Sequence, residues 1–414
     1  MVLRPGYKQT DVGVIPLEWD AKTIDQVAFV TSGKRLPLGS SLVDHPTPHP
    51  YVRVTDMRPG TVSLSEIKFV PESVFPAIRR YRIFCDDLFI SVAGSLGIVG
   101  KVPTELDGAN LTENADRITN ITCSQDFLLH VLMSPLIQNT IDSIQTVGAQ
   151  PKLALTRIRK FAIPQPPLPE QRAIAAALGD VDALLGALDR LIAKKRDLKQ
   201  AAMQQLLTGQ TRLPGFHGEW EVKRLSAIVQ TPVTDGPHLT PRFLDDGVPF
   251  LSVNNLAENR IDLRELRFIS QADHELFSRK CRPRKDDILL GKAASVGKVA
   301  LVELDVEFNI WSPIALIRVS SDNAPRFLFY QLQSADLVEQ IALLTNSSSQ
   351  GNIGMGEIEK LMLRLPHLPE QTAIAEVLAE MDAELSALDE RRTKTHALKQ
   401  AMMQELLTGR TRLV

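Results

Sequence analysis

The sequence predicts an α+β protein in which two pseudo-repeated mixed α/β domains are joined by two long helices that form an antiparallel coiled coil. Three observations lead to this fold class. The chain of 414 residues contains an internal duplication, each copy ends in a segment with coiled-coil spacing, and the rest of each copy holds short apolar runs between turn residues. Such a repeat constrains the architecture more strongly than any single motif.

The duplication is clearest where Leu-Pro-Glu-Gln at 168–171 returns at 368–371, an offset of 200 residues. The match continues without a gap to 213 and 413, and 28 of these 46 aligned positions are identical. Weaker matches, such as Trp19 with Trp220, extend through the remaining chain. We therefore predict four segments, two of them variable domains (1–167 and 213–367) and two of them near-constant helical spacers (168–212 and 368–414).

Each constant segment is predicted to be one long helix. Pro169 and Pro369 suit the first helical position, where a missing N–H costs nothing, and Gly209 and Gly409 suit the C-terminal cap. Apolar residues between them follow the 4-3-4-3 spacing of a coiled-coil seam rather than the broad face of a globular helix. The seam consists of Ile174, Leu178, Val181, Leu185 and Leu188 in the first copy and Ile374, Leu378, Met381, Leu385 and Leu388 in the second.

A helix with so narrow an apolar stripe needs a partner, and its near-twin in the same chain is the simplest one. A whole domain connects the two helices, so either orientation is sterically possible, and an antiparallel pair would relate the halves by a pseudo-twofold. The alternative is that each helix packs only on its own domain. Arg392 and Thr395 interrupt the seam in the second copy, which leaves surface for other subunits.

The variable segments read as mixed α and β structure. Turn residues such as Thr234-Asp235-Gly236-Pro237 separate runs that favour strands. One helix per half is expected, near 126–144 and 325–344. The predicted strands lie at 51–54, 88–92, 250–253, 288–290 and 314–317.

Composition excludes several classes of protein. With 47 basic and 49 acidic residues the net charge is −2, so the chain is no globally basic nucleic-acid binder and any DNA contact must come from local patches. Three widely spaced cysteines without a CxxC pair argue against a disulfide framework or a zinc site and favour a reducing cytoplasm. No apolar run approaches the roughly 18–20 residues of a membrane span, so we expect no membrane partner.

No strong catalytic motif is present. The glycine-lysine loops at 94–102 and 291–299 have the wrong spacing for a P-loop, and each lysine that follows the last glycine precedes valine. They predict either a tight strand-loop-strand or a glycine loop close to a phosphate backbone. Asp56, Glu66 and Lys68 loosely match a magnesium-dependent nuclease, which remains one alternative. No histidine pair has metal-binding spacing, so we predict no metal site and a non-catalytic chain.

Two basic clusters occupy matching places in the halves. They are Arg79-Arg80-Tyr81-Arg82 and the run from Arg279 to Lys285. Charge runs are often only solvated faces, but arginine and lysine at such places could also anchor DNA phosphates, while polar loop residues read base edges.

The ordered set of motifs resembles the specificity subunit of type I restriction-modification systems. The motifs are the Leu-Pro-Glu-Gln and Ala-Ile-Ala pairs, the Leu-Leu-Thr-Gly helix ends, Gly13 to Trp19, Leu111 to Asn114, Thr234 to His238, and Pro249 to Leu251. The resemblance covers essentially the whole chain. Each motif alone is weak evidence for the family, but the order and the duplication of the motifs are specific to it.

The resemblance implies that two target-recognition domains each read one half of a split sequence in double-stranded DNA. It implies that the helices form an antiparallel coiled coil, set the half-site separation and help dock two methyltransferase (M) subunits, which translocase-nuclease (R) subunits join. S-adenosylmethionine, ATP and magnesium would then lie on these partners, and this chain would need no cofactor.

Candidate DNA-binding residues follow from the motifs and basic clusters. In the first domain they are Ser32, Lys34, Arg53, Asp56, Arg79, Arg80, Arg82, Ser95, Asn110 and Thr112. In the second they are Thr234, Asp235, His238, Thr240, Arg242, Asn254, Asn255, Arg279, Arg282, Lys292 and Ser295. The 234–238 loop could equally be a structural turn capped by Asp235. A coiled-coil scaffold without a DNA role is a third hypothesis, beside the DNA reader and the nuclease.

Overall fold

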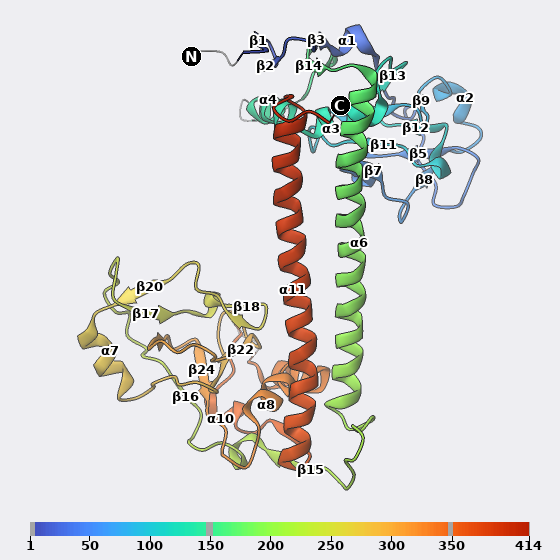
Figure 1. Ribbon diagram of the computed structural model, residues 1–414. Helices are drawn as coiled ribbons and strands as arrows, with labels where there is room; N and C mark the ends of the chain where they lie inside the picture. The colour runs from blue at the N-terminus through green and yellow to red at the C-terminus, as the bar shows by residue number, and fades with distance from the viewer. Residues whose placement is uncertain (1–4, 146–151, 347–350, 414) are drawn as a thin grey trace. The chain divides into compact units, whose positions relative to one another are not determined.

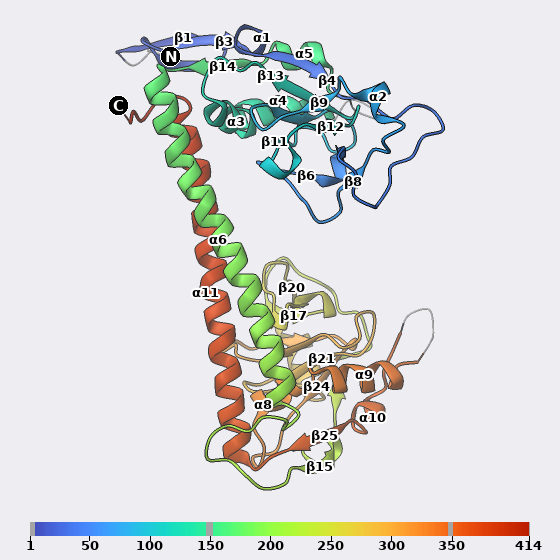
Figure 2. The same ribbon diagram turned by 90° about the vertical axis from the view of Figure 1, so that its right-hand side faces the viewer.

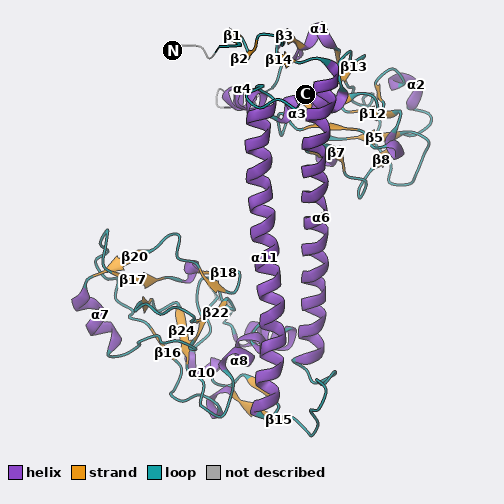
Figure 3. Cartoon of the chain, viewed as in Figure 1, coloured by secondary structure: helices purple, strands orange, loops and turns teal. Residues whose placement is uncertain are grey.

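The computed structural model describes residues 5–145, 152–346 and 351–413. The chain divides into two compact units, one formed by 1–189 with 390–414 and the other by 190–389. We call them unit 1 and unit 2. Each unit mixes helices with small sheets (Figure 1, Figure 3). Unit 1 is discontinuous, because the end of the chain returns to complete it.

Unit 1 is built around two four-stranded sheets, with strand orders β11-β10-β13-β4 and β8-β5-β12-β9. All pairs in the first sheet are antiparallel, whereas β5 and β12 pair in parallel. A hairpin β1-β2 and the pairs β3-β14 and β6-β7 complete the strands. The bounds are β1 Tyr7–Thr10, β2 Gly13–Pro16, β3 Asp20–Thr23, β4 Phe29–Ser32, β5 Pro50–Val52, β6 Met57–Arg58, β7 Thr61–Val62, β8 Lys68–Phe69, β9 Arg82–Ile83, β10 Leu88–Ser91, β11 Val99–Lys101, β12 Ala109–Leu111, β13 Ala115–Thr119 and β14 Ala162–Gln165.

Unit 2 repeats this topology with strand orders β16-β24-β21-β22 and β20-β17-β23, again with one parallel pair, β17 with β23. The duplication therefore extends through the variable segments, although their sequences have diverged. The bounds are β15 Glu221–Arg224, β16 Thr234–Asp235, β17 Val248–Leu251, β18 Leu256–Ala257, β19 Arg260–Ile261, β20 Arg267–Ile269, β21 Ile288–Gly291, β22 Val299–Leu301, β23 Asn309–Ile310, β24 Ile314–Ile317 and β25 Met362–Leu365.

The expectation of one helix per variable segment is wrong. The segment near 126–144 forms two helices that break at Ser134, and the segment near 325–344 breaks at Ser334. Pro135 follows the first break, and the Ser334 hydroxyl accepts a hydrogen bond from the N–H of Leu337 as an N-cap. The helices are α1 Ile24–Val27, α2 Phe75–Ile78, α3 Gln125–Met133, α4 Pro135–Gln145, α5 Leu155–Arg159, α7 Gln271–Ser278, α8 Pro325–Gln331, α9 Ala335–Leu344 and α10 Met355–Ile358.

The two predicted long helices are confirmed as α6 (Leu168–Leu206) and α11 (Leu368–Leu406), each of 39 residues. Within unit 1 the start of α6 lies beside the end of α11 (Figure 2), where Asp182 pairs with Lys399 and Asp189 with Arg392. Within unit 2, Lys195 pairs with Glu384 and Lys199 with Asp382. In both units the partner number falls as the α6 number rises, so the helices are antiparallel.

The apolar seam serves two purposes. Ile174 and Leu178 are fully buried in the core of unit 1 together with Met403 and Leu406 of α11, and Ile374 and Leu378 occupy the matching place in unit 2. Each helix thus packs on its own domain and on its partner at once. Leu188 is buried as well, whereas Val181, Leu185, Met381, Leu385 and Leu388 are only partly buried.

A polar cluster repeated in both units attaches the helices to the domains. In unit 1, Asp182 of α6 pairs with Lys399 at 2.5 Å and lies 3.9 Å from the buried imidazole of His130 on α3. The counterpart in unit 2 is formed by Asp382, Lys199 and Tyr330, whose hydroxyl donates to Asp382 at 2.8 Å. Of these two clusters, the histidine version alone contains an imidazole, whose ordinary pKa is near neutral.

We therefore expect the two junctions to differ in pH dependence. Burial lowers the pKa of His130, opposed by Asp182, so the unfolded chain binds the proton more tightly than the fold does. The stabilising contribution should be complete above pH ~6.5, the unfolded value, and should be lost as the pH falls toward the lower folded pKa. Thermal unfolding of the full chain between pH 7.5 and 5.5 should show a steeper loss for wild type than for His130→Tyr, and equal slopes would contradict this.

Candidate nucleic-acid interface

A basic pocket of about 190 Å³ opens at one end of the antiparallel sheet in unit 1. It lies where β4 ends, opposite the segment that links α2 to β9. Lys34 donates its backbone N–H to Leu111 at 2.8 Å and Leu111 donates to Tyr81 at 2.9 Å, which holds the three segments together. The lining includes Ser32, Gly33, Arg80, Tyr81, Arg82 and Arg117.

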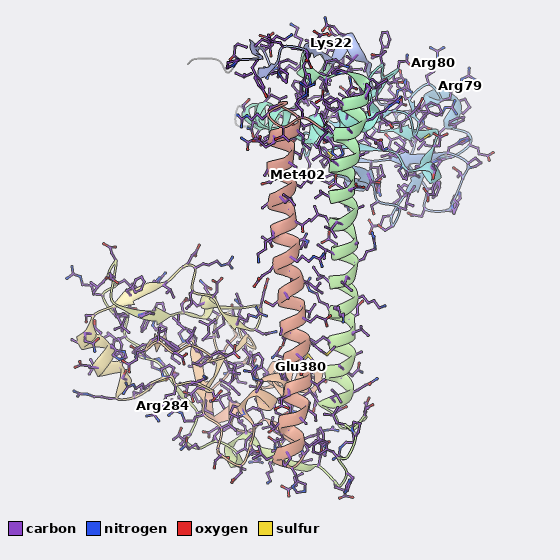
Figure 4. The ribbon with its side chains drawn as sticks, in the orientation of Figure 1. Lys22, Arg79, Arg80, Arg284, Glu380 and Met402 are labelled. Carbon is purple, nitrogen blue, oxygen red and sulfur yellow. The ribbon has the colours of Figure 1, made fainter. Side chains whose placement is uncertain are left out.

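The pocket contains more positive charge than its surroundings neutralise. Arg117 donates to the carbonyl oxygen of Arg82 at 2.6 Å and lies 3.6 Å from the buried carboxylate of Asp87. The guanidinium groups of Arg80 and Arg82 have no ion pair or hydrogen bond with any residue that the structure describes. Arg79 and Arg80 lie at the surface of unit 1 (Figure 4), so their charges are open to an incoming anion.

A buried carboxylate lies behind this pocket. The hydroxyl of Ser32 donates to Asp116 at 2.7 Å across the β4–β13 pair. Burial raises the pKa of Asp116, while the Ser32 hydrogen bond and the charges of Lys152 and Arg159 act in the opposite direction. Asp116 is 2% exposed, so the residues around it shield its carboxyl group from solvent.

The corresponding region of unit 2 is arranged differently. Asp235 at the end of β16 is fully buried, and its carboxylate lies 2.5 Å from the ammonium group of Lys280 and 3.1 Å from that of Lys292. Burial opposes ionisation, but these two lysines outweigh it and lower the pKa of Asp235. The imidazole of His238 approaches the same carboxylate at 3.2 Å. Asp235 is therefore part of an ion cluster, not a turn cap.

The structure places the remaining candidates in two groups. Most of them have exposed side chains, although Ser32 donates to Asp116 and Arg282 pairs with Glu307, whereas Thr234 and Ser295 are half-buried. The exposed group comprises Ser32, Lys34, Arg79, Arg80, Arg82, Ser95, His238, Thr240, Arg242, Asn254, Arg279 and Arg282.

Several candidates are buried, and their polar groups stabilise the fold. Asn110 is fully buried and donates to the carbonyl of Ile78 at 2.8 Å, and Asn255 donates to the carbonyls of Asp262 and Glu265. No residue in this set is more than 9% exposed, so little of any side chain is open to a DNA strand, and this corrects their assignment as direct contacts. The set is Asp56, Asn110, Thr112, Asp235, Asn255 and Lys292.

The nuclease arrangement is not present among the described residues. The carboxylate of Asp56 is bound by Arg53 at 2.6 Å, and Arg53 also donates to the carbonyl of Glu66. Lys68 pairs with Asp44 instead of approaching Asp56. Within the described ranges no three His, Cys, Asp or Glu side chains are grouped so that they could share a metal ion.

The glycine loops form tight connections between antiparallel strands, as one of the two interpretations expected. Leu88 pairs with Lys101 and Ile288 with Leu301, and Gly97 and Gly297 each donate their N–H back to the preceding strand. The sequence did not predict Arg117 as a charged member of the first cluster, and Lys280, although part of the second basic run, was not among the candidate DNA contacts. Aligning the two basic runs would have placed Lys280 opposite Arg80.

Comparison with known proteins assigns the chain to a family. The model of the type I restriction modification DNA specificity domain matches twice, at residues 16–194 and 217–396. The chain belongs to this family. The two matches together cover most of the chain, which agrees with the duplicated topology of the two units.

Relatives across the specificity family match nearly the whole chain. A Methanocaldococcus jannaschii protein named for the specificity subunit of the type I restriction enzyme MjaX is 24% identical, over 98% of this chain and 97% of its own. The EcoBI specificity subunit of Escherichia coli is 21% identical, over 94% of this chain and 84% of its own. The S subunit of the type I restriction-modification system of M. genitalium has the same fold, with a TM-score of 0.61 at 16% identity, over 98% and 99% of the two chains.

Proposed function

We propose that this chain is the DNA sequence-specificity subunit of a type I restriction-modification enzyme, in which each unit reads one half of a bipartite DNA site. The observation that carries the proposal is the doubled match to a DNA specificity domain, over two units of the same topology with different polar surfaces. Constant helices with divergent domains suit a site whose two halves differ while their separation is fixed.

The proposal includes partners and a division of labour. Two methyltransferase subunits dock on the helical segments, translocase-nuclease subunits join the complex, and S-adenosylmethionine, ATP and magnesium bind to those partners. This chain contributes recognition without catalysis. We also propose a reducing, cytoplasmic setting, supported by three cysteines that are all free. No helix in the described part of the chain has the length and apolar character to cross a membrane.

An exchange of one variable segment tests the proposal. Residues 1–167 are replaced by the aligned segment of another family member, and the chain is co-expressed with its methyltransferase subunits. We expect the mapped methylation sequence to change in one half only, because unit 2 and the helices are retained. The matched control exchanges 213–367 and should change the other half. Methylation that is unaltered by both exchanges would reject the proposal.

A further inference from the structure

The basic pocket of unit 1 has a residue-by-residue counterpart in unit 2. Arg80 and Arg82 correspond to Lys280 and Arg282 at the offset of 200. Both runs precede a buried aspartate that accepts a backbone N–H, from Phe84 to Asp87 at 2.9 Å and from Arg284 to Asp287 at 2.7 Å. The two pockets are therefore built on the same backbone framework.

The residues opposite these cations also correspond. Gly33 and Gly236 both follow the first strand of the antiparallel sheet and lie against a backbone carbonyl, which aligns Ser32 with Asp235. In the parallel pairs, Asn110 faces Tyr51 and Asn309 faces Phe250, which aligns Gly108 with Glu307. Two neutral positions of unit 1 are thus acidic in unit 2.

In unit 2 both acids neutralise the cations. Asp235 contacts Lys280 at 2.5 Å, and Glu307 pairs with Arg282. Lys280 and Arg282, the cations that correspond to Arg80 and Arg82, thus each contact a carboxylate of the same chain, although Asp235 is shared with Lys292 at 3.1 Å. An outside anion would have to compete with these two carboxylates for the cations.

In unit 1 neither acid exists. Ser32 stands where Asp235 does, and at Gly108 an added Cβ would lie only 3.8 Å from the guanidinium of Arg82. Position 108 is therefore close enough for an acid to reach Arg82, and the chain has glycine there. Asp116 is buried behind Ser32 and is absent from the pocket lining.

We propose that the pocket of unit 1 binds one phosphate of the DNA backbone, and that unit 2 closes the corresponding pocket with its own carboxylates, Asp235 and Glu307. The inference rests on the proposed function. Guanidinium groups bind phosphate oxygens through paired hydrogen bonds, which suits Arg80 and Arg82. A depression of unit 2 is lined by Arg282, Arg284 and Lys285, but its lining also includes Asp305 and Glu307, and Glu307 pairs with Arg282.

The pocket of unit 1 should then contribute more of the salt-dependent DNA affinity than the corresponding positions of unit 2, Lys280 and Arg282. Each phosphate contact adds close to one counterion to the salt dependence of binding. Removing a cation from the open pocket should lower both the affinity and the salt slope. Removing its counterpart from the closed pocket should change neither, because that charge is already neutralised.

The test uses the full chain in complex with its methyltransferase subunits, titrated with duplex DNA that carries the mapped methylation sequence. Arg80→Gln should weaken binding by about fivefold or more near 0.1 M salt and reduce the salt slope by about one, while Arg80→Lys keeps the slope. Arg82→Gln tests the same pocket independently. Lys280→Gln is the matched control and should stay within about twofold of wild type, whereas Glu307→Gln, which frees Arg282, should increase the slope by about one.

Equal responses of DNA binding to Arg80→Gln and Lys280→Gln, in variants that are fully folded at the temperature of the titration, would overturn the inference. Titration of the full chain with inorganic phosphate separates the two sources of phosphate. Thermal stabilisation by inorganic phosphate that Arg80→Gln abolishes, with an unchanged DNA salt slope, would also overturn it. A wild-type complex without sequence-specific DNA binding would instead reject the proposed function itself.

Discussion

Glu170→Ala is expected to destabilise unit 1 by about 3 kcal/mol. Glu170 of α6 is fully buried, accepts the indole N–H of Trp19 at 2.9 Å and binds the Arg412 guanidinium, with Nη2 at 2.9 Å. Removing the carboxylate leaves the buried indole N–H without its acceptor, and leaves Arg412 with the exposed Glu18 in place of a buried partner. Arg412 keeps 30% exposure, so solvent compensates in part and the loss falls at the lower end for a buried pair.

The control for this variant is Glu18→Ala. Glu18 also binds Arg412, at 3.1 Å, but it is 73% exposed, and its removal should cost less than about 0.5 kcal/mol. Glu370→Ala tests the repeated contact in unit 2, where Arg212 donates to Glu370 at 2.5 Å and the indole N–H of Trp220 has no acceptor among the described residues. It should cost about 1 kcal/mol less than Glu170→Ala. Denaturant unfolding measures all three, and equal effects of Glu170→Ala and Glu18→Ala would contradict the assignment.

Gly236→Ala is expected to cost about 3 kcal/mol or more, and Gly33→Ala a similar amount. A Cβ added to Gly236 would lie 1.7 Å from the carbonyl oxygen of Ile310, and one added to Gly33 would lie 2.0 Å from that of Thr112. Both obstacles are backbone atoms, so the strand ends must separate. In unit 2 this displaces Asp235 from Lys280 and Lys292 as well.

Gly179→Ala provides the control for the glycine variants. Gly179 lies inside α6, and an added Cβ meets nothing within 4 Å. Alanine is the better helix former, so this variant should be more stable by up to about 1 kcal/mol. Thermal and denaturant unfolding of the three variants give the comparison. A Gly236→Ala protein as stable as wild type would show that this close approach is dispensable.

The sequence predicts the two long helices well because the residues that determine each helix lie within one segment and occur in both copies. Proline at the start, glycine after the end and the 4-3-4-3 seam all lie within one segment, and the near-identical copy checks each of them. The breaks at Ser134 and Ser334 were missed because the apolar residues on both sides continue to read as helix. The capping role of Ser334 depends on a backbone N–H that only the fold positions.

The location of the basic site was predictable from the sequence, but whether carboxylates neutralise its cations was not. Both basic runs were recognised from sequence, but Asp235 lies 45 residues from Lys280 in the chain, and Glu307 lies 25 from Arg282. These neutralising contacts arise from strand pairing, which composition does not reveal. Polar residue type likewise failed to distinguish Asn110, which is buried, from Asn254, which is exposed. Burial decides that difference, and burial depends on tertiary structure.

The discontinuity of unit 1 sets an order of events during synthesis. Unit 2 is a single stretch, 190–389, and all of its core residues have been added to the chain before 390–414 are made. Unit 1 needs Met403, Leu406 and Leu407 in its core, together with Arg412 against Glu170. The half of the chain that is synthesised first is therefore completed last, and a chain that ends before residue 403 would contain the whole core of unit 2 but an incomplete core of unit 1. Domains usually mature from the N-terminus onward, and this topology reverses that order.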